Sequence, residues 1–130
     1  MCQYRCTIKR ILYRYLAVVH SLELPLKILI TNTALATYAG TEVVVRDLSL
    51  ELKRQGHVPM VYSPRLGAVA EEIKSHGIEV SDQLTNLSAP PDIIHGHHHA
   101  QVIEALLQFP SIPGVYVCHA AAGLLEDKHA

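Results

Sequence analysis

Two segments of this chain have the same order of helix-forming residues, glycine and then apolar residues. Residues 51–56 and 72–77 each close a helical pattern with a glycine, Gly56 or Gly77, and an apolar run follows. Glycine adopts the left-handed conformation that ends a helix, so each segment predicts a helix that turns directly into a strand. Helices and strands are therefore expected to alternate, which predicts a parallel sheet with right-handed crossovers.

Apolar runs and helical periodicity locate the expected elements. Strands are expected at 26–31, 57–63, 78–80, 92–95 and 114–119, and helices at 41–55, 67–76 and 99–108. Thr41 is expected to cap the first helix. Pro59 is unfavourable within the second strand, because proline has no N–H to donate to a neighbouring strand. That strand is therefore expected to begin as late as Met60. The last helix is expected to turn four residues inward: Val102, Ile103, Leu106 and Leu107.

These elements predict an α/β fold, a Rossmann-like three-layer sandwich with a mainly parallel sheet of about five strands. The chain stops soon after the fifth expected strand, where a doubly wound fold would place further elements. The sequence therefore predicts a fold that is incomplete at its C-terminal side, in a truncated chain.

Charge and cysteine content exclude several classes of protein. The formal net charge is −1, which gives no case for a nucleic-acid-binding surface. Cys2, Cys6 and Cys118 form no CxxC pair and leave an odd count, so a reducing, cytoplasmic compartment is expected. No apolar run is long enough to span a bilayer.

Residues 1–24 are interpreted as a basic N-terminal extension, helical or disordered, outside the folded unit. Residues 1–20 contain Arg5, Lys9, Arg10 and Arg14 but no acidic residue. One alternative is an amphipathic helix that contacts an anionic membrane peripherally, and another is a poor signal peptide. We favour an extension from an upstream start codon without a role in the fold.

A run of histidines follows the expected strand at 92–95. His95, His97, His98 and His99 lie where an open α/β sheet binds its ligands, at the carboxyl end of a strand. Strand alternation places His95 and His97 on one face and turns His98 away. The His-x-His spacing also occurs in metallohydrolases, but no acidic residue follows among these histidines, so metal binding is a minor alternative.

The loop after the first expected strand opens onto a helix N-terminus, which attracts anions through free N–H groups. Gly40 is its one glycine, and neither GxGxxG nor a Walker motif occurs, so a dinucleotide site is disfavoured. His119 ends the fifth expected strand as His97 ends the fourth. If strands one, four and five are neighbours, Gly40, His97 and His119 converge on one rim of the sheet.

Five short motifs in order resemble the N-terminal domain of the family-4 type GT-B glycosyltransferases. The resemblance covers residues 27–119, and each motif is weak alone, whereas the ordered set is fairly specific. The motifs are Lys27-Ile-Leu-Ile, Ala39-Gly40-Thr41-Glu42, Arg54-Gln55-Gly56-His57, Pro91-Asp92-Ile93-Ile94-His95-Gly96-His97 and Val115-Tyr116-Val117-Cys118-His119. Ala39 departs from the family pattern, which has a glycine there.

The resemblance implies that residues 25–130 are part of the acceptor-side domain of a two-domain enzyme. Such an enzyme transfers a hexose from a nucleotide sugar to a hydroxyl of a sugar or lipid-linked acceptor. By resemblance, Gly40, Thr41 and His95 would bind substrate, and His97 and His119 are the catalytic candidates. No metal or other cofactor is implied. The nucleotide-sugar donor would bind a second domain, so this fragment is expected to be inactive.

Two other classes of function stay open. One is a non-enzymatic Rossmann-like module that binds an anion at the helix beginning near Gly40. The other is a histidine-based metallohydrolase.

Overall fold

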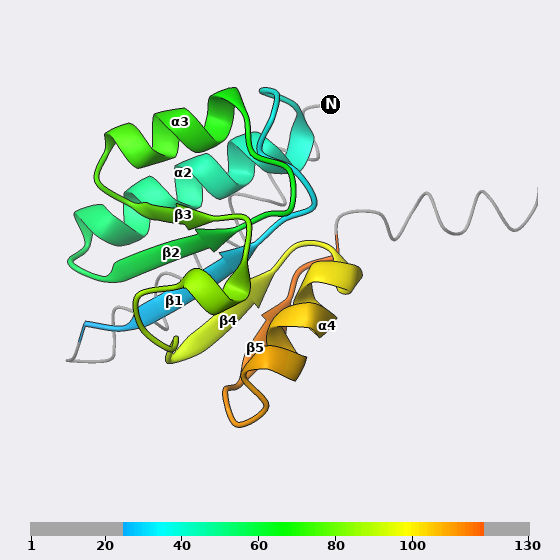
Figure 1. Cartoon of the computed structure of the whole chain (residues 1–130). Coiled ribbons are helices and arrows are strands. Elements are labelled where there is room, and N and C mark those ends of the chain that lie inside the picture. Colours follow the sequence, from blue (N-terminus) through cyan, green and yellow to red (C-terminus); the bar gives the residue numbers. More distant parts are fainter. Residues whose placement is uncertain (1–24, 119–130) are drawn as a thin grey trace, which may run out of the picture.

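The computed structural model describes residues 25–118, which form an open five-stranded parallel sheet between two layers of helices (Figure 1). The strands are β1 (Lys27–Thr31), β2 (Val58–Tyr62), β3 (Glu79–Ser81), β4 (Ile93–Gly96) and β5 (Gly114–Tyr116). The helices are α2 (Gly40–Arg54), α3 (Ala68–Ser75) and α4 (His99–Gln108), with a 3-10 turn, η1 (Leu84–Asn86). This is the Rossmann-like three-layer α/β fold predicted from the sequence.

The order of the strands is β3-β2-β1-β4-β5, and all neighbours are parallel. The chain builds outward from β1 to β3, then returns to the other side of β1 and builds outward again. Right-handed crossovers in opposite directions place their helices on opposite faces. Accordingly, α2 and α3 cover one face and α4 covers the other, as Figure 1 shows.

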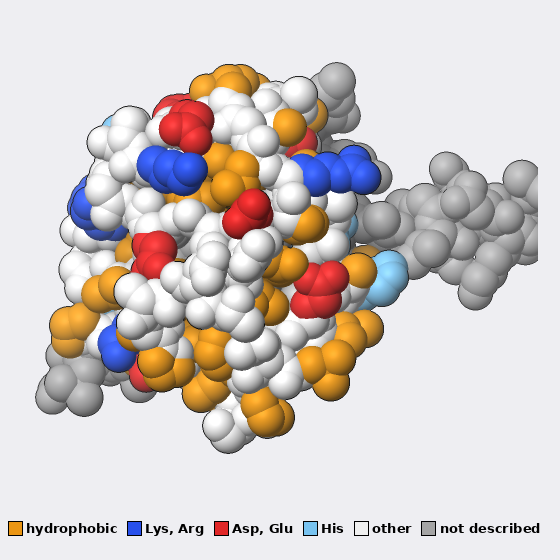
Figure 2. All heavy atoms as spheres, viewed as in Figure 1, with side chains coloured by type: hydrophobic (Ala, Val, Ile, Leu, Met, Phe, Trp, Pro, Cys, Tyr) orange, Lys and Arg blue, Asp and Glu red, His pale blue; other side chains and the backbone are white. Residues whose placement is uncertain are grey.

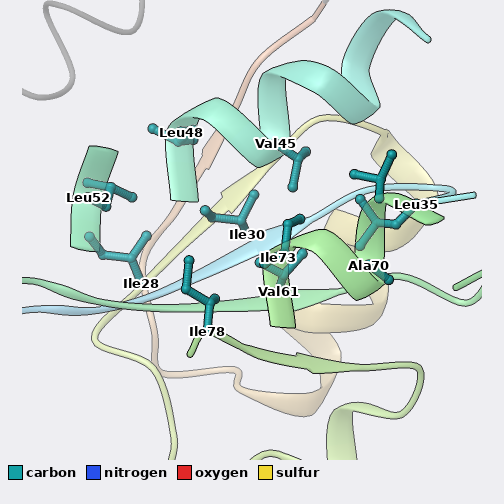
Figure 3. Packing of buried hydrophobic residues seen from close by; sticks show 11 residues of the cluster. Ile28, Ile30, Leu35, Val45, Leu48, Leu52, Val61, Ala70, Ile73 and Ile78 are labelled. Atoms are coloured by element: carbon teal, nitrogen blue, oxygen red, sulfur yellow. The ribbon is translucent and has the colours of Figure 1, made fainter. Parts of the chain in front are cut away.

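Two apolar clusters fill the spaces between these layers. β1 serves both, because Ile28 and Ile30 point toward α2 while Leu29 points toward α4, and all three are fully buried. A strand covered on both faces has an unbroken apolar run, as the centre of β1 has at residues 28–30. Figure 3 shows the larger cluster: Ile28, Ile30, Leu35, Val45, Leu48, Leu52, Val61, Val69, Ala70, Ile73 and Ile78. The smaller cluster consists of Leu29, Met60, Tyr62, Ile94 and Ala105.

The two helix ends predicted at Gly56 and Gly77 are confirmed. Gly56 has φ +91° and Gly77 has φ +76°, both in the left-handed region. The His57 N–H donates to the Leu52 carbonyl at 3.0 Å, and the Gly56 N–H donates to the Lys53 carbonyl at 3.0 Å. This pair of bonds is the Schellman motif, which satisfies the last carbonyls of α2 and directs the chain into β2.

The late start predicted for the second strand is wrong. β2 begins at Val58 and contains Pro59, which is opposite Ile28 of β1. The Val58 N–H donates to the Leu26 carbonyl at 2.9 Å, so the nitrogen of the next residue points away from β1. The pairing of β3 with β2 begins only opposite Met60. The missing N–H of Pro59 therefore removes no bond from the sheet.

The inward face predicted for the last helix is also wrong, except at Val102. Ile103, Leu106 and Leu107 are 53%, 36% and 77% exposed, whereas Gln101, Val102 and Ala105 are buried. The helix is apolar on two sides, so periodicity alone could not choose the buried one. The small side chain of Ala105 lets this side lie close to the sheet.

The cap expected from Thr41 is absent. α2 begins one residue earlier, at Gly40, and its N-cap is Ala39, which has no side-chain acceptor. The Glu42 carboxylate instead accepts the Thr37 N–H at 2.6 Å, which fixes the loop before the helix. A carboxylate in the first turn also complements the positive end of the helix.

Within residues 25–118, no helix combines the length and apolarity needed to cross a bilayer. The basic extension at 1–24 and His119 lie outside the described residues.

Candidate functional site

The candidate site lies where the two halves of the sheet diverge. β1 and β4 are neighbours, with Thr31 opposite Gly96. After these residues the chain leaves β1 toward α2 on one face and leaves β4 toward α4 on the other. Open α/β folds bind ligands in the crevice that this divergence creates at the carboxyl ends of the strands. The His97 N–H extends the pairing by one bond, to the Thr31 carbonyl at 3.3 Å.

Gly40 lies at the start of α2, next to Thr41, which contacts His98 after β4. Its φ is +36°, and an added Cβ would have open space around it. The position therefore favours glycine because of its backbone conformation and not because of crowding. The first N–H groups of a helix have no partners within the helix, so the start of α2 can offer hydrogen-bond donors to a ligand oxygen.

His98 connects the start of α4 to the start of α2. Its Nε2 lies 3.3 Å from the Thr41 hydroxyl oxygen, which links the N-terminus of α4 to that of α2. The prediction that His98 turns away from the Gly40 loop is therefore wrong. Strand alternation holds as far as His97, whose N–H still bonds to Thr31 of β1; at His98 the chain turns into α4.

The electrostatic environment of His98 favours its neutral form. Burial lowers the pKa of its imidazole, and the neighbouring His99 lowers it further. A neutral imidazole has one N–H donor and one acceptor nitrogen. His98 can therefore exchange a hydrogen bond with the Thr41 hydroxyl in either direction.

His95 and His97 share one face, as strand alternation predicts. Their ring centroids are 4.8 Å apart with an interplanar angle of 58°, and each residue is 3% exposed. His95 lies within β4, between Ile30 and Val115, whereas His97 follows the end of the strand. Of these two histidines, His97 is the one at the rim. The structure does not describe His119, the other catalytic candidate.

Two polar residues at the crevice were missed in the sequence. The Thr33 hydroxyl donates to the side-chain amide oxygen of Gln101, Oε1, at 2.9 Å and ties the β1–α2 loop to the first turn of α4. Asn32 is 1% exposed, and its side-chain N–H donates to the Ala34 carbonyl at 2.7 Å. Within residues 25–118, Asn32 Oδ1 has no hydrogen-bond partner. The sequence feature that could have indicated this position is the side-chain amide of Asn32, which directly follows the first strand at its carboxyl end.

Gly96 allows the two sides of the crevice to approach each other. A Cβ at this position would lie 1.8 Å from Val102 Cγ2 and 3.0 Å from Thr31 Oγ1. α4 can therefore pack this closely against β4 and β1 only because the residue between them has no side chain.

The chemistry of this crevice suits a neutral or anionic polar ligand better than a metal or a dinucleotide. Within the part of the chain that the structure describes, no group of three or more His, Cys, Asp or Glu residues could hold a metal ion. β2 is followed by Ser63 and Pro64, where a dinucleotide site would need an acidic residue for the ribose.

No family model, curated protein or solved structure matches this chain. Function is therefore inferred from the sequence motifs and the geometry of the crevice.

Proposed function

We propose that the chain provides the acceptor-side domain of a GT-B-type glycosyltransferase. The reaction would move a hexose from a nucleotide sugar to a hydroxyl of a sugar or lipid-linked acceptor, and a second Rossmann-like domain facing the crevice would hold the donor. The 3.3 Å contact between Thr41 and His98 carries the proposal. It joins the Gly40 loop to the histidine run, and these are two of the motifs on which the resemblance depends.

The crevice residues have distinct roles in this proposal. In glycosyl transfer the acceptor oxygen bonds to the anomeric carbon, loses its proton, and displaces the nucleoside diphosphate. The N–H groups at Gly40 and Thr41 would hold a substrate oxygen, since a helix N-terminus favours negative charge. His97, at the rim, would bind a hydroxyl of the reacting sugar, and the pair formed by Thr41 and His98 would fix the distance between the starts of α2 and α4.

A non-enzymatic anion-binding module is the second candidate. The N-termini of α2 and α4 meet at the contact between Thr41 and His98, and both helix ends favour an anion. Such a module would bind phosphate as well as it binds a sugar phosphate.

Amide NMR of the full chain distinguishes the two candidates. Methyl α-glucoside, UDP-glucose, GDP-mannose and inorganic phosphate are titrated separately. The transferase proposal expects a sugar-bearing probe to shift the amides of Gly40, Thr41 and His97 at concentrations where phosphate does not. Equal shifts with phosphate alone favour the anion module.

Two variants and a matched control make the titration specific. Gly40→Ala and His97→Ala should each weaken the response to the sugar probe about tenfold or more, the loss expected for one or two hydrogen bonds. Val58→Ala changes an exposed residue at the opposite end of the sheet and should leave the response unchanged. Absence of any sugar-dependent shift at the crevice would contradict the proposal.

A further inference from the structure

The three helices differ in how their N-termini are satisfied. At α3, the Ala68 N–H donates to the Ala36 carbonyl at 3.2 Å, and the Ala70 N–H donates to the Leu35 carbonyl at 3.1 Å. At α2, Glu42 places a carboxylate in the first turn, where it complements the positive end of the helix. The β1–α2 loop and the Glu42 carboxylate therefore already satisfy these two helix ends.

The start of α4 has neither of these features. Its first turn contains no acidic residue, and the side chain of its N-cap, His98, makes no capping hydrogen bond. Within residues 25–118, the first backbone N–H of this helix with a partner is that of Val102, which donates to the His98 carbonyl at 3.1 Å. The backbone N–H groups of His99, Ala100 and Gln101 can therefore donate to a ligand.

Gln101 adds a side-chain amide donor to this end of the helix. Its side chain is directed into the crevice, because its Oε1 accepts the hydroxyl of Thr33 in the β1–α2 loop at 2.9 Å. Gln101 is only 7% exposed, and within the part of the chain that the structure describes its Nε2 has no hydrogen-bond partner. Unlike Asn32 Oδ1, this nitrogen is not fully enclosed by protein atoms, so a ligand oxygen can reach it.

Few charged side chains surround this end of α4. Residues 93–118 contain no Lys or Arg, and Glu104 is their only acidic residue. On the face in view, Figure 2 accordingly shows no Lys or Arg side chain where Figure 1 places α4. The Glu104 carboxylate accepts the Tyr62 hydroxyl at 2.5 Å and lies about one helical turn beyond Gln101. The helix dipole therefore supplies a positive potential at the start of α4 without a lysine or an arginine.

We propose that the start of α4 is an anion subsite, in which Gln101 Nε2 and the first backbone N–H groups of the helix donate to a phosphate or carboxylate oxygen. Each of these groups is a donor, and an ionised phosphate or carboxylate oxygen is an acceptor. A hydroxyl would leave its own proton without an acceptor there. Thr33 is a positioning residue, because its hydroxyl holds the Gln101 amide in this orientation.

The subsite narrows the substrate class of the proposed transferase, and this step rests on the proposed function. The starts of α2 and α4 are adjacent, since Thr41 and His98 approach to 3.3 Å. An acceptor bound across the crevice would place a hydroxyl near Gly40 and an anionic group at the start of α4. The acceptor is therefore a sugar that carries a phosphate or carboxylate group.

Amide NMR of the full chain with inorganic phosphate, at constant pH and ionic strength, tests the subsite. Phosphate should shift the backbone amides of His99 and Ala100 and the side-chain NH2 group of Gln101. The amides of Gly40 and Thr41, at the start of α2, should respond less. No shift at the α4 amides with phosphate up to about 10 mM, or an equal response at the start of α2, would overturn the proposal.

Variants of Gln101 test the direct contact. Gln101→Met keeps the length of the side chain, removes the donor, and should weaken phosphate binding about tenfold or more. Gln101→Glu keeps the acceptor for Thr33 but replaces the donor with a charged oxygen, so it should abolish binding. Gln108→Met is the matched control, because Gln108 is exposed at the other end of α4, and it should bind phosphate as the wild type does. Phosphate binding that withstands both Gln101 variants would overturn the proposal.

The positioning role of Thr33 has its own test. Thr33→Val removes the hydroxyl that orients the Gln101 amide and should weaken phosphate binding, whereas Thr33→Ser keeps the hydroxyl and should restore it. A Thr33→Ser variant as weak as Thr33→Val would refute this role.

Sugar probes separate this inference from the proposed function. Methyl α-glucoside tests the transferase proposal at Gly40 and His97, whereas phosphate tests the start of α4. Glucose 6-phosphate, α-glucose 1-phosphate and glucuronate carry both groups, and at least one should bind about tenfold or more tighter than phosphate or methyl α-glucoside. Binding of all three no tighter than phosphate would refute the anionic acceptor. A phosphate response without any sugar response would support the subsite and contradict the transferase, and the reverse result would contradict the subsite alone.

Discussion

Replacing Gly96 by alanine should destabilise the protein by forcing α4 away from the sheet. The new methyl would lie 1.8 Å from Val102 Cγ2 and 3.0 Å from Val102 Cβ. Rotating the Val102 side chain would remove only the first clash, and a β-branched residue in a helix has little freedom to rotate. The helix must therefore move, and overpacking of this kind costs about 1–3 kcal/mol. We expect a loss near 3 kcal/mol, because the overlap involves a helix and not a flexible side-chain end.

The double variant isolates the clash. Val102→Ala removes Cγ2 and by itself should cost about 1–2 kcal/mol through the lost burial of two methyl groups. In Gly96→Ala/Val102→Ala the worst contact is gone, so the combined loss should be smaller than the sum of the single losses by at least about 1 kcal/mol. Urea unfolding of the three variants and the wild type measures these free energies.

Gly114→Ala is the matched control on the neighbouring strand. Its Cβ would meet Leu106 Cδ2 at 3.2 Å, which is the end of a partly exposed side chain that can move. We expect a change within about 0.5 kcal/mol. Additive losses at Gly96 and Val102, or an equal loss at Gly114, would refute the close packing of α4 against β4.

Three further predictions concern the helix stop and two titrating groups. Gly56→Ala should cost about 1–2 kcal/mol in urea unfolding, because φ is +91°; an unchanged midpoint would contradict this. Burial, and then the hydrogen bond to Glu104, raise the pKa of Tyr62 from 10.0 to about 12. Stability from this phenol is present below pH 10 and is lost as the pH rises through 12. In an ultraviolet titration, part of the tyrosinate signal should appear only near pH 12, and Glu104→Gln should bring that part to a lower pH. Hydrogen bonding by Arg54 lowers the pKa of Glu51 from 4.5 to about 2. The stability that ionised Glu51 contributes to the folded state is present above pH 4.5 and is lost as the pH falls toward 2. Glu51→Gln should flatten this part of the acid-unfolding curve.

The fold was predictable because its signals are local. Gly56 and Gly77 mark helix ends through a backbone conformation that few other residues adopt, and β1 reveals its burial through an unbroken apolar run. The shared face of His95 and His97 was predictable for the same reason, since alternation along a strand is local geometry.

The features that could not be predicted depend on neighbours distant in sequence. Pro59 is tolerated because β3 starts one residue later, which a strand pattern cannot show. The buried side of α4 is set by its approach to Gly96, although the sequence offers a more apolar side at Ile103, Leu106 and Leu107. His98 reaches Thr41 only because two helices begin at the same point of the sheet. Three-dimensional packing decided each of these cases.

The β1–α2 loop is anchored on both sides of the crevice. Leu35 is fully buried; its N–H donates to the Arg65 carbonyl at 2.7 Å, and its carbonyl accepts the Ala70 N–H at 3.1 Å. On the other side, Thr33 bonds to Gln101. A ligand would therefore meet a preorganised loop and would lose little conformational entropy on ordering it. Since the loop contacts both halves of the fold, binding should slow amide hydrogen exchange in α3 and α4 together, which makes the crevice a thermodynamic link between the halves.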